Sequence, residues 1–261
     1  MTKSPRIELL AVPDFPLVRP GDDLAALLAE RLIAAGMAPR NGDVLVLAQK
    51  IVSKAEGRIV DLATVTPSPR ARALAAEVGK DPRLVETILS ESVRVVRHRP
   101  NLLIMEHRLG FVMANAGVDH SNLAAHGSPP GAPDQVLLLP VAPDASAARL
   151  RTELNARFGV TLAVVITDSF GRPWRRGSAG VAIGAAGLPA LVDLRGTPDL
   201  FGRTLEVTLV GLADEIAASA SLLQGQAAEG QPAVLLRGLA WSAPDAPAGA
   251  LVRPPAEDLF R

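Results

Sequence analysis

Hydrophobic and polar positions along this chain follow two different periods, which indicates a mixture of helices and strands. In residues 22–35 the leucines share one helical face, with Asp22 placed to cap the start and Gly36 placed to end it. Similar spacing predicts helices at 68–78, 81–89, 144–158 and 214–223. Short apolar runs predict strands at 44–48, 102–105, 109–113, 136–139, 160–166, 205–210 and 233–236. The alternation favours an α+β or α/β fold and leaves the strand order open.

Composition narrows the class of protein. The chain has 261 residues, 48% hydrophobic and 21% charged, enough apolar material for one large domain or two small ones. A net charge of +0, with no Tyr and only two Trp, argues against nucleic acid as the partner. The absence of Cys removes disulfides, thiolate metal sites and cysteine nucleophiles. No signal pattern and no apolar run of about 18 residues occurs, so we expect a cytoplasmic protein with no membrane partner.

Several common enzyme motifs are missing. There is no glycine-rich phosphate loop ending in Lys-Ser/Thr, no Gly-x-Gly-x-x-Gly and no Gly-x-Ser-x-Gly. The histidines lack the helical zinc-binding spacing. A P-loop enzyme, a Rossmann dehydrogenase, a serine hydrolase and a zinc hydrolase are therefore all disfavoured.

Asp168 follows the apolar run 160–166, so we expect its carboxylate at the carboxyl end of a strand, where α/β proteins place ligands. Ser169 adds an oxygen donor, and a carboxylate beside a hydroxyl suits Mg²⁺ or Mn²⁺. Arg172 and Arg175 follow closely and are suited to holding phosphate or carboxylate groups. A surface turn with solvated arginines is the alternative interpretation.

Asp119 lies in a second polar segment, just after the predicted strand pair, where Asn122 adds an amide. The same residue types also form ordinary turns, and spacing alone does not bring Asp119 to Asp168. Lys50 and Lys54 follow the strand 44–48 and would lie one helical turn apart, facing a crevice that could bind phosphates. Two solvated lysines are the plainer alternative. The residues alone thus indicate an enzyme that binds phosphate and a divalent metal.

Taken together, these segments resemble the coenzyme F420-0:L-glutamate ligases, which add γ-linked glutamates to a deazaflavin coenzyme. The resemblance runs in matching order over essentially the whole chain and is to the stand-alone form of the family. Position 49 is Gln where the family has a small hydroxyl residue, and position 169 is Ser where Thr or Asp is more usual. The matching segments are 12–15, 19–23, 49–54, 56–58, 116–122, 165–175, 213–217, 224–226 and 253–261.

The resemblance implies an α+β fold with mixed sheets and flanking helices, specific to this family, that forms an intertwined homodimer. It implies one ligase domain over residues 1–241, which could divide into two sub-lobes, with 242–261 as its C-terminal tail. The implied substrates are the coenzyme precursor, L-glutamate and GTP. The implied ions are two divalent cations, Mg²⁺ or Mn²⁺, with K⁺ as a further candidate.

The resemblance also assigns roles to residues. Asp119 and Asp168 would bind one divalent ion, with Ser169 and Gln226 at a second. Lys54, Arg172 and Arg175 would join the two aspartates as the catalytic set, steadying the transferred phosphoryl group. The residues expected to contact GTP are Val12, Pro13, Asp14, Phe15, Gln49, Lys50, Lys54, Asn122, Gln224, Gly225 and Gln226.

The expected reaction starts with phosphorylation of the precursor's terminal carboxylate by GTP. The amine of L-glutamate then attacks the acyl phosphate, and GDP and phosphate leave. A kinase or nucleotide hydrolase that uses the same carboxylates is one alternative. A protein that binds a nucleotide or a deazaflavin without turnover is another, although two carboxylates beside basic residues suit chemistry better than storage.

Overall fold

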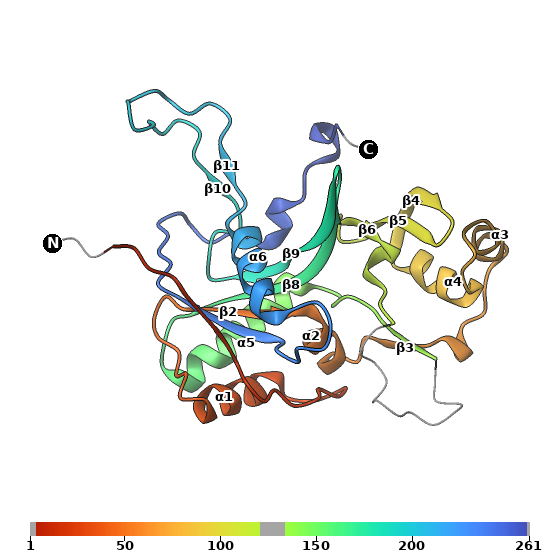
Figure 1. Ribbon diagram of the computed structural model, residues 1–261, viewed down its shortest axis with the longest axis horizontal. Coiled ribbons are helices and arrows are strands. Elements are labelled where there is room, and N and C mark those ends of the chain that lie inside the picture. Colours follow the sequence, from red (N-terminus) through yellow and green to blue (C-terminus); the bar gives the residue numbers. More distant parts are fainter. Residues whose placement is uncertain (1–3, 121–133, 260–261) are drawn as a thin grey trace.

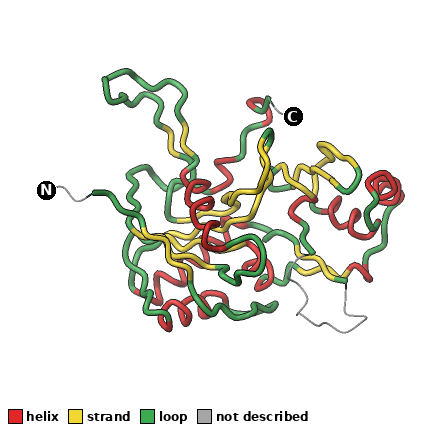
Figure 2. The backbone as a smooth tube through the Cα atoms, in the orientation of Figure 1, coloured by secondary structure: helices red, strands yellow, loops and turns green. Residues whose placement is uncertain are grey.

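The structure is a computed structural model that describes residues 4–120 and 134–259. It consists of a body built on one central sheet, a lobe at the side of the body and a projecting arm (Figure 1). Figure 2 shows strands gathered at the middle of the body with helices around them. None of the helices in the described part of the chain is both long and apolar enough to cross a membrane.

The central sheet has five strands in the order β1-β12-β2-β8-β9. Only β2 and β8 run parallel, and the other neighbours are antiparallel. The fold is therefore mixed, with several sheets, as an α+β class requires. The strands are β1 (Glu8–Ala11), β2 (Val44–Ala48), β8 (Ala163–Arg172), β9 (Arg175–Ala186) and β12 (Ala233–Arg237).

The two faces of this sheet carry alternate residues of each strand and pack on different helices. On β2, Leu45 and Leu47 face α1, α2 and α5, while Val44 and Val46 face α6. All four valine and leucine side chains are fully buried, so the sheet is a hydrophobic layer between two helical layers. The helices are α1 (Leu24–Ala34), α2 (Gln49–Ala55), α5 (Pro143–Phe158) and α6 (Leu212–Gln224).

The lobe is formed by the chain between α2 and α5 and has a hydrophobic core of its own. Its sheet has the order β4-β5-β6, and β3 pairs with β7 where the chain enters and leaves the lobe. The elements are β3 (Ile59–Asp61), η1 (Leu62–Thr64), α3 (Pro69–Val78), α4 (Pro82–Ser90), β4 (Ser92–Arg99), β5 (Leu102–His107), β6 (Val112–Ala114), η2 (Asn115–Gly117) and β7 (Gln135–Leu137).

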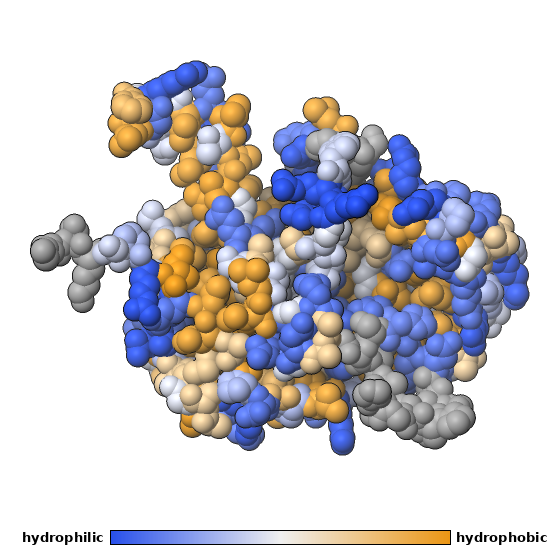
Figure 3. All heavy atoms as spheres, in the orientation of Figure 1, coloured by the Kyte–Doolittle hydropathy of each residue, from blue (hydrophilic) through white to orange (hydrophobic). Residues whose placement is uncertain are grey.

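The arm begins at β10 (Val192–Asp193) and returns at β11 (Leu209–Val210), with a long loop between them. It projects away from the body at the upper left of Figure 1. Leu200 and Phe201 in this loop are each 92% exposed, and orange spheres mark apolar residues along the arm in Figure 3. The C-terminal segment, with η3 (Ala248–Leu251) and η4 (Pro255–Glu257), returns to the body, where Ala248 is buried.

Most predicted elements are confirmed, but two capping assignments are wrong. Asp23 caps α1 by accepting a hydrogen bond from the N–H of Ala26, whereas Asp22 accepts one from the N–H of Arg19. Asp144 does not cap α5; its carboxylate accepts bonds from backbone N–H groups of β9 and of the C-terminal segment. The pattern also missed β1, β3, β4, β9 and β10, and only Leu209–Val210 of the strand predicted over 205–210 is a strand. The largely exposed side chains of β4 give no clear alternation.

Candidate active site

A pocket of about 420 Å³ opens where the only parallel pair of the described strands ends. The pairing of β2 with β8 stops at Ala48 and Thr167, and both residues line the pocket. α2 begins at the next residue after β2, so its first turn also faces the space. The position follows the general rule that ligands bind beyond the carboxyl ends of strands.

Asp119 and Lys50 form an ion pair at this pocket. Lys50 Nζ lies 2.7 Å from Asp119 Oδ2. The backbone of Asp119 is held by β7, because its N–H donates to the carbonyl of Leu137 at 3.0 Å and its carbonyl accepts from the Leu137 N–H at 2.8 Å. The two charges therefore come from different parts of the fold, one from the body and one from the lobe connection.

Asp168 lies in the same pocket on β8. Burial raises the pKa of its carboxyl from 3.8 to about 6, and the negative charge of Asp119 adds to the rise. The N–H of Ser169, which donates to Asp168 Oδ1 at 2.8 Å, and the charge of Lys50 act in the opposite direction. Asp119 and Asp168 line the same pocket, and the negative charge of Asp119 acts on the carboxyl of Asp168.

Lys54 and Gln49 complete the α2 side of the pocket. Burial, and then the positive charge of Lys50, lowers the pKa of Lys54. A bound anion would offset the effect of both, so this corner suits a phosphate group. Gln49 is 2% exposed, and its side-chain oxygen accepts a hydrogen bond from Ser53 Oγ at 2.7 Å within the same helix.

The opposite wall is the segment that follows α6. Gly225 ends α6 with a φ of 70°, a conformation that glycine adopts without strain. Glu229 fills the space beside Gly225 and accepts a hydrogen bond from the N–H of Ala227 at 2.8 Å, which makes a compact turn. The pocket-lining residues of this wall are Gln224, Gly225, Gln226, Ala227, Ala228, Gly230, Gln231 and Pro232.

The donor set suits a hard divalent cation. Two carboxylates face the same pocket, burial and the charge of Asp119 raise the pKa of Asp168, and a cation between the two would offset both effects. Ser169 and Gln226 add oxygen donors along the lining. No group of three or more His, Asp or Glu side chains suited to a metal occurs within 4–120 and 134–259. Asp119 and Asp168 are the two carboxylates that line the pocket, so a cation held there would need further oxygens from other groups.

Not every residue of the expected site lies at the pocket. Of the N-terminal group, Phe15 lines the pocket, whereas Val12 is fully buried in the core and Pro13 and Asp14 are exposed nearby. Arg172 and Arg175 lie at the exposed tip of the β8–β9 hairpin, outside the lining of this pocket. Asn122 is outside the described residues.

Some lining residues escaped the sequence reasoning. Thr167 is buried and gives no polar pattern, because it continues the apolar strand before Asp168. Gly180 on β9 allows α6 to approach, since a side chain there would overlap the backbone carbonyl of Ala217. The ion pair of Lys50 with Asp119 joins two distant segments and has no sequence signal. Other lining residues not anticipated are Pro16, Leu17, Val18, Ala48, Ile51, Ser221 and Pro232.

Comparison with known proteins identifies relatives of the whole chain. A coenzyme F420:L-glutamate ligase of Methanopyrus kandleri is 48% identical over 262 aligned residues, covering 98% of both chains. The protein of the same name from Methanothermobacter thermautotrophicus is 46% identical, covering 98% of this chain and 99% of the relative. A third, from Methanocaldococcus jannaschii, is 38% identical over 98% of this chain and 97% of the relative.

A family description covers the same region. The sequence model of the F420-0:gamma-glutamyl ligases matches residues 14–238, which include β2, β8, α2 and the pocket that they form. Matches of this length and identity cover both the body and the lobe. The chain therefore belongs to the F420-0:gamma-glutamyl ligase family.

Proposed function

We propose that this protein is a GTP-dependent ligase that joins L-glutamate to the terminal carboxylate of coenzyme F420-0 through an amide bond. We further propose that it adds more γ-linked glutamates to the product. The names of the relatives support the substrate pair, and they agree with family membership. One observation carries the chemistry: the Lys50–Asp119 ion pair and the half-buried Asp168 face one pocket beside Lys54.

The reaction requires an activated carboxylate. A carboxylate oxygen of the precursor attacks the γ-phosphorus of GTP, the bond to the β-phosphate oxygen breaks, and GDP leaves. The amine of L-glutamate then attacks the carbonyl carbon of the acyl phosphate. Phosphate departs with the electrons of the broken C–O bond, and the amine releases a proton. Each turnover converts one GTP into GDP and phosphate and forms one amide.

The basic side of the pocket is suited to the phosphates. Lys50 is held by Asp119, and Lys54 lies one helical turn further along α2. Burial, and then the positive charge of Lys50, lowers the pKa of Lys54, and a negatively charged group would offset both effects. These lysines would orient the γ-phosphate toward the carboxylate that attacks it, which lowers the entropic part of the barrier.

The acidic side is suited to the metal. Asp119 and Asp168 would hold one divalent cation, and Ser169 and Gln226 offer oxygens for a second. When bound, such an ion, Mg²⁺ or Mn²⁺, would supply positive charge to offset the negative charge of the phosphates. The chain's own contribution is to fix each carboxylate: the backbone of Asp119 exchanges two hydrogen bonds with Leu137, and the Asp168 carboxylate accepts one from the N–H of Ser169.

We also propose a homodimer in which the two projecting segments meet the second copy. Trp174 at the β8–β9 tip is 81% exposed, and Leu200 and Phe201 on the arm are each 92% exposed. Apolar side chains this exposed on projecting segments are typical of association surfaces. In such a dimer the tip would carry Arg172 and Arg175 toward the neighbouring copy, which gives them a role outside their own pocket.

The test is a reaction with GTP, Mn²⁺, L-glutamate and coenzyme F420-0, followed by mass spectrometry of the coenzyme and by phosphate assay. We expect phosphate release in a one-to-one ratio with glutamate added, and no release when glutamate is omitted. Release without glutamate would indicate a nucleotide hydrolase. Binding of GTP without any release, with every substrate present, would indicate a binding protein instead.

A further inference from the structure

Arg58 lies where the chain leaves the body for the lobe. Its backbone forms hydrogen bonds with α2, which carries Lys50, and with the segment at β7 that holds Asp119. Its N–H donates to the carbonyl of Ser53 in α2, the helix that carries Lys50, at 2.9 Å. Its own carbonyl accepts from the N–H of Leu138 at 2.9 Å, next to Leu137, which exchanges two hydrogen bonds with Asp119. Arg58 therefore connects the helix that carries Lys50 to the segment that fixes the backbone of Asp119.

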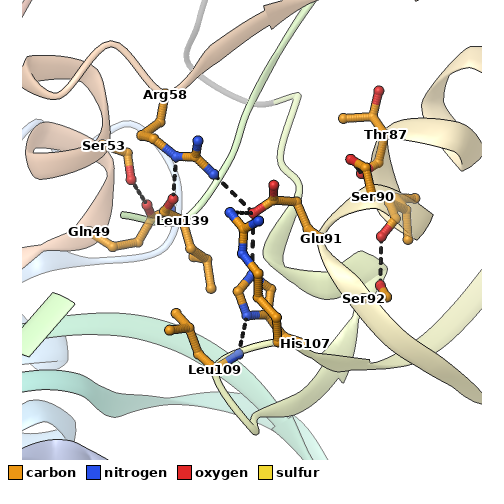
Figure 4. A network of polar contacts seen from close by, with 12 residues as sticks. Gln49, Ser53, Arg58, Thr87, Ser90, Glu91, Ser92, His107, Leu109 and Leu139 are labelled. Carbon is orange, nitrogen blue, oxygen red and sulfur yellow. Dashed lines mark hydrogen bonds and ion pairs between the residues drawn. The ribbon is translucent and has the colours of Figure 1, made fainter. Parts of the chain in front are cut away.

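The side chain of Arg58 adds a second bond to the segment after β7 and one to the lobe. Nε donates to the carbonyl of Leu139 at 2.9 Å, and Nη2 donates to Glu91 Oε2 at 2.9 Å (Figure 4). A guanidinium group can make both bonds at once because its donors are fixed in a plane, whereas an ammonium group lacks that geometry. The strand segment after β7 is thus tied to Arg58 through both backbone and side chain.

Glu91, at the end of α4, fixes the guanidinium from the lobe side. It is only 5% exposed, and besides Arg58 it accepts a hydrogen bond from Arg108 Nη2 at 2.8 Å. Burial disfavours its charge, but the adjacent imidazole of His107 and the charges of Arg58 and Arg108 outweigh that effect, so the pKa of Glu91 is lowered. Glu91 is therefore an ionised buried group, and removing its charge would leave Arg58 with a weaker partner.

The same turn of the lobe also touches the strand of Asp168. His107 Nδ1 accepts a hydrogen bond from the N–H of Leu109 at 2.9 Å, which shapes the turn before Phe111 (Figure 4). The Phe111 ring packs edge-on against Phe170 with centroids 5.8 Å apart. Phe170 is on β8, two positions after Asp168, so the lobe contacts both acidic sides of the pocket.

We propose that Arg58, held by Glu91, is a positioning residue that sets the relative placement of Lys50 and Asp119. The effect of Arg58 on turnover rests on the proposed ligase function, whereas its effect on the placement of Asp119 does not. Neither side chain is among the pocket-lining residues, so each acts through α2 and β7 rather than by contact with substrate. Small misplacement of reacting groups can lower a rate by about 10²-fold.

The test compares Arg58→Lys and Glu91→Gln with Arg94→Lys as the matched control. Arg94 lies in the same lobe on β4 and pairs with Glu106 on β5 at 2.7 Å, so this ion pair joins two strands of the lobe sheet rather than β7 and α2. Three measurements are made on each full-length variant: the melting temperature, kcat and KM for glutamate-dependent phosphate release, and hydrogen exchange in peptides that contain Asp119 or Leu137.

For Arg58→Lys and Glu91→Gln we expect kcat to fall about 10-fold or more, with KM for GTP and glutamate changed less than about threefold. Exchange at the Asp119 and Leu137 amides should be faster than in the wild type, and Arg94→Lys should match the wild type in both respects. Wild-type kcat and exchange in the first two variants would overturn the proposal. So would a loss of activity that tracks melting temperature equally in all three variants.

Glu91→Gln keeps the size of the side chain, so it serves if Arg58→Lys fails to fold. Failure of both variants to fold would assign the network to stability alone and overturn the positioning role. If the wild type makes no glutamylated product, the proposed ligase function fails. The exchange comparison still decides whether Arg58 and Glu91 hold Asp119, because it needs no substrate.

Discussion

Asp168 in the pocket and Asp193 at the base of the arm show how one residue type acquires opposite properties. Burial and the nearby charge of Asp119 raise the pKa of Asp168 to about 6. Hydrogen bonds from the side chain and backbone of Arg195 lower the pKa of Asp193 to about 2. Asp193 is exposed, and its ion pair with Arg195 at 2.6 Å satisfies its charge.

Unfavourable negative charge is concentrated in the pocket rather than on the arm. The arm pairs its acidic group with a neighbour in sequence, so it gains nothing by binding a cation. The pocket gathers Asp119 and Asp168 from distant segments and leaves part of their repulsion uncompensated by Lys50. The pKa values of both carboxyls depart from the ordinary value, but only the shift of Asp168 arises from burial and a like charge in a pocket, the combination typical of sites that carry chemistry.

The largest expected effect is on the pocket carboxylates. Asp168→Asn and Asp119→Asn should each lower glutamate-dependent turnover by about 10²-fold or more, because each removes a charge suited to the metal. Asp193→Asn is the matched control on the arm and should keep turnover within about threefold of wild type. Steady-state phosphate release at saturating Mn²⁺ measures all three.

Near wild-type turnover in both pocket variants would remove the metal assignment and the contrast with the arm. A loss in Asp193→Asn as large as in the pocket would show that the arm also contributes to the reaction. Mn²⁺ binding followed by electron paramagnetic resonance separates these outcomes. Only the pocket variants should weaken it.

A second comparison uses two glycines of the long β8–β9 hairpin. Gly180→Ala places a methyl group against the carbonyl of Ala217 in α6, while Gly171→Ala places one in open space. Overpacking of a tight contact costs about 1–3 kcal/mol, so Gly180→Ala should lower the free energy of unfolding by that amount and displace α6 from the pocket. Denaturant unfolding of both variants measures the difference. Equal stability of the two would mean that α6 is not tightly seated on β9.

A smaller effect is expected on association. Phe201→Ser on the arm should weaken the dimer about tenfold in its dissociation constant, because it removes one large exposed apolar side chain from the proposed contact. Ile33→Ser, which changes an exposed apolar residue on α1, is the control. Sedimentation of both variants over a range of concentrations measures the dissociation constants. A wild-type protein that is monomeric at all concentrations contradicts the proposed dimer.

The sequence predicted much of the fold because helix caps and apolar runs depend on residues that are close together in the chain. The helix over 69–78 begins at Pro69 after the Ser68 cap and ends at Gly79, as the pattern predicts. Strand β2 matches its predicted limits, since its side chains are buried on both faces and form one apolar run. The carboxyl end of β8 was placed too early, because polar residues from Asp168 onward continue as an exposed hairpin with β9.

The candidate site likewise has features that local spacing predicted and features that it did not. The pairing of Lys50 and Lys54 on one helical face follows from their spacing, and both line the pocket. The expected place of Arg172 and Arg175 beside Asp168 does not hold within one chain, because the hairpin carries them away from the pocket. Proximity in sequence is a poor guide along an extended strand, where each residue advances about 3.3 Å.

The sequence by itself determined the residue types of the site, the helices and strands that bear them, and membership of one family, because each depends on local order or on similarity along the chain. Only the tertiary structure decided that Asp119 meets Lys50, that Asp119 and Asp168 repel each other, and that Arg58 links their supports. Those contacts join segments far apart in the chain. They form only when the lobe returns through β7 to the side of α2, and no period or motif encodes that return.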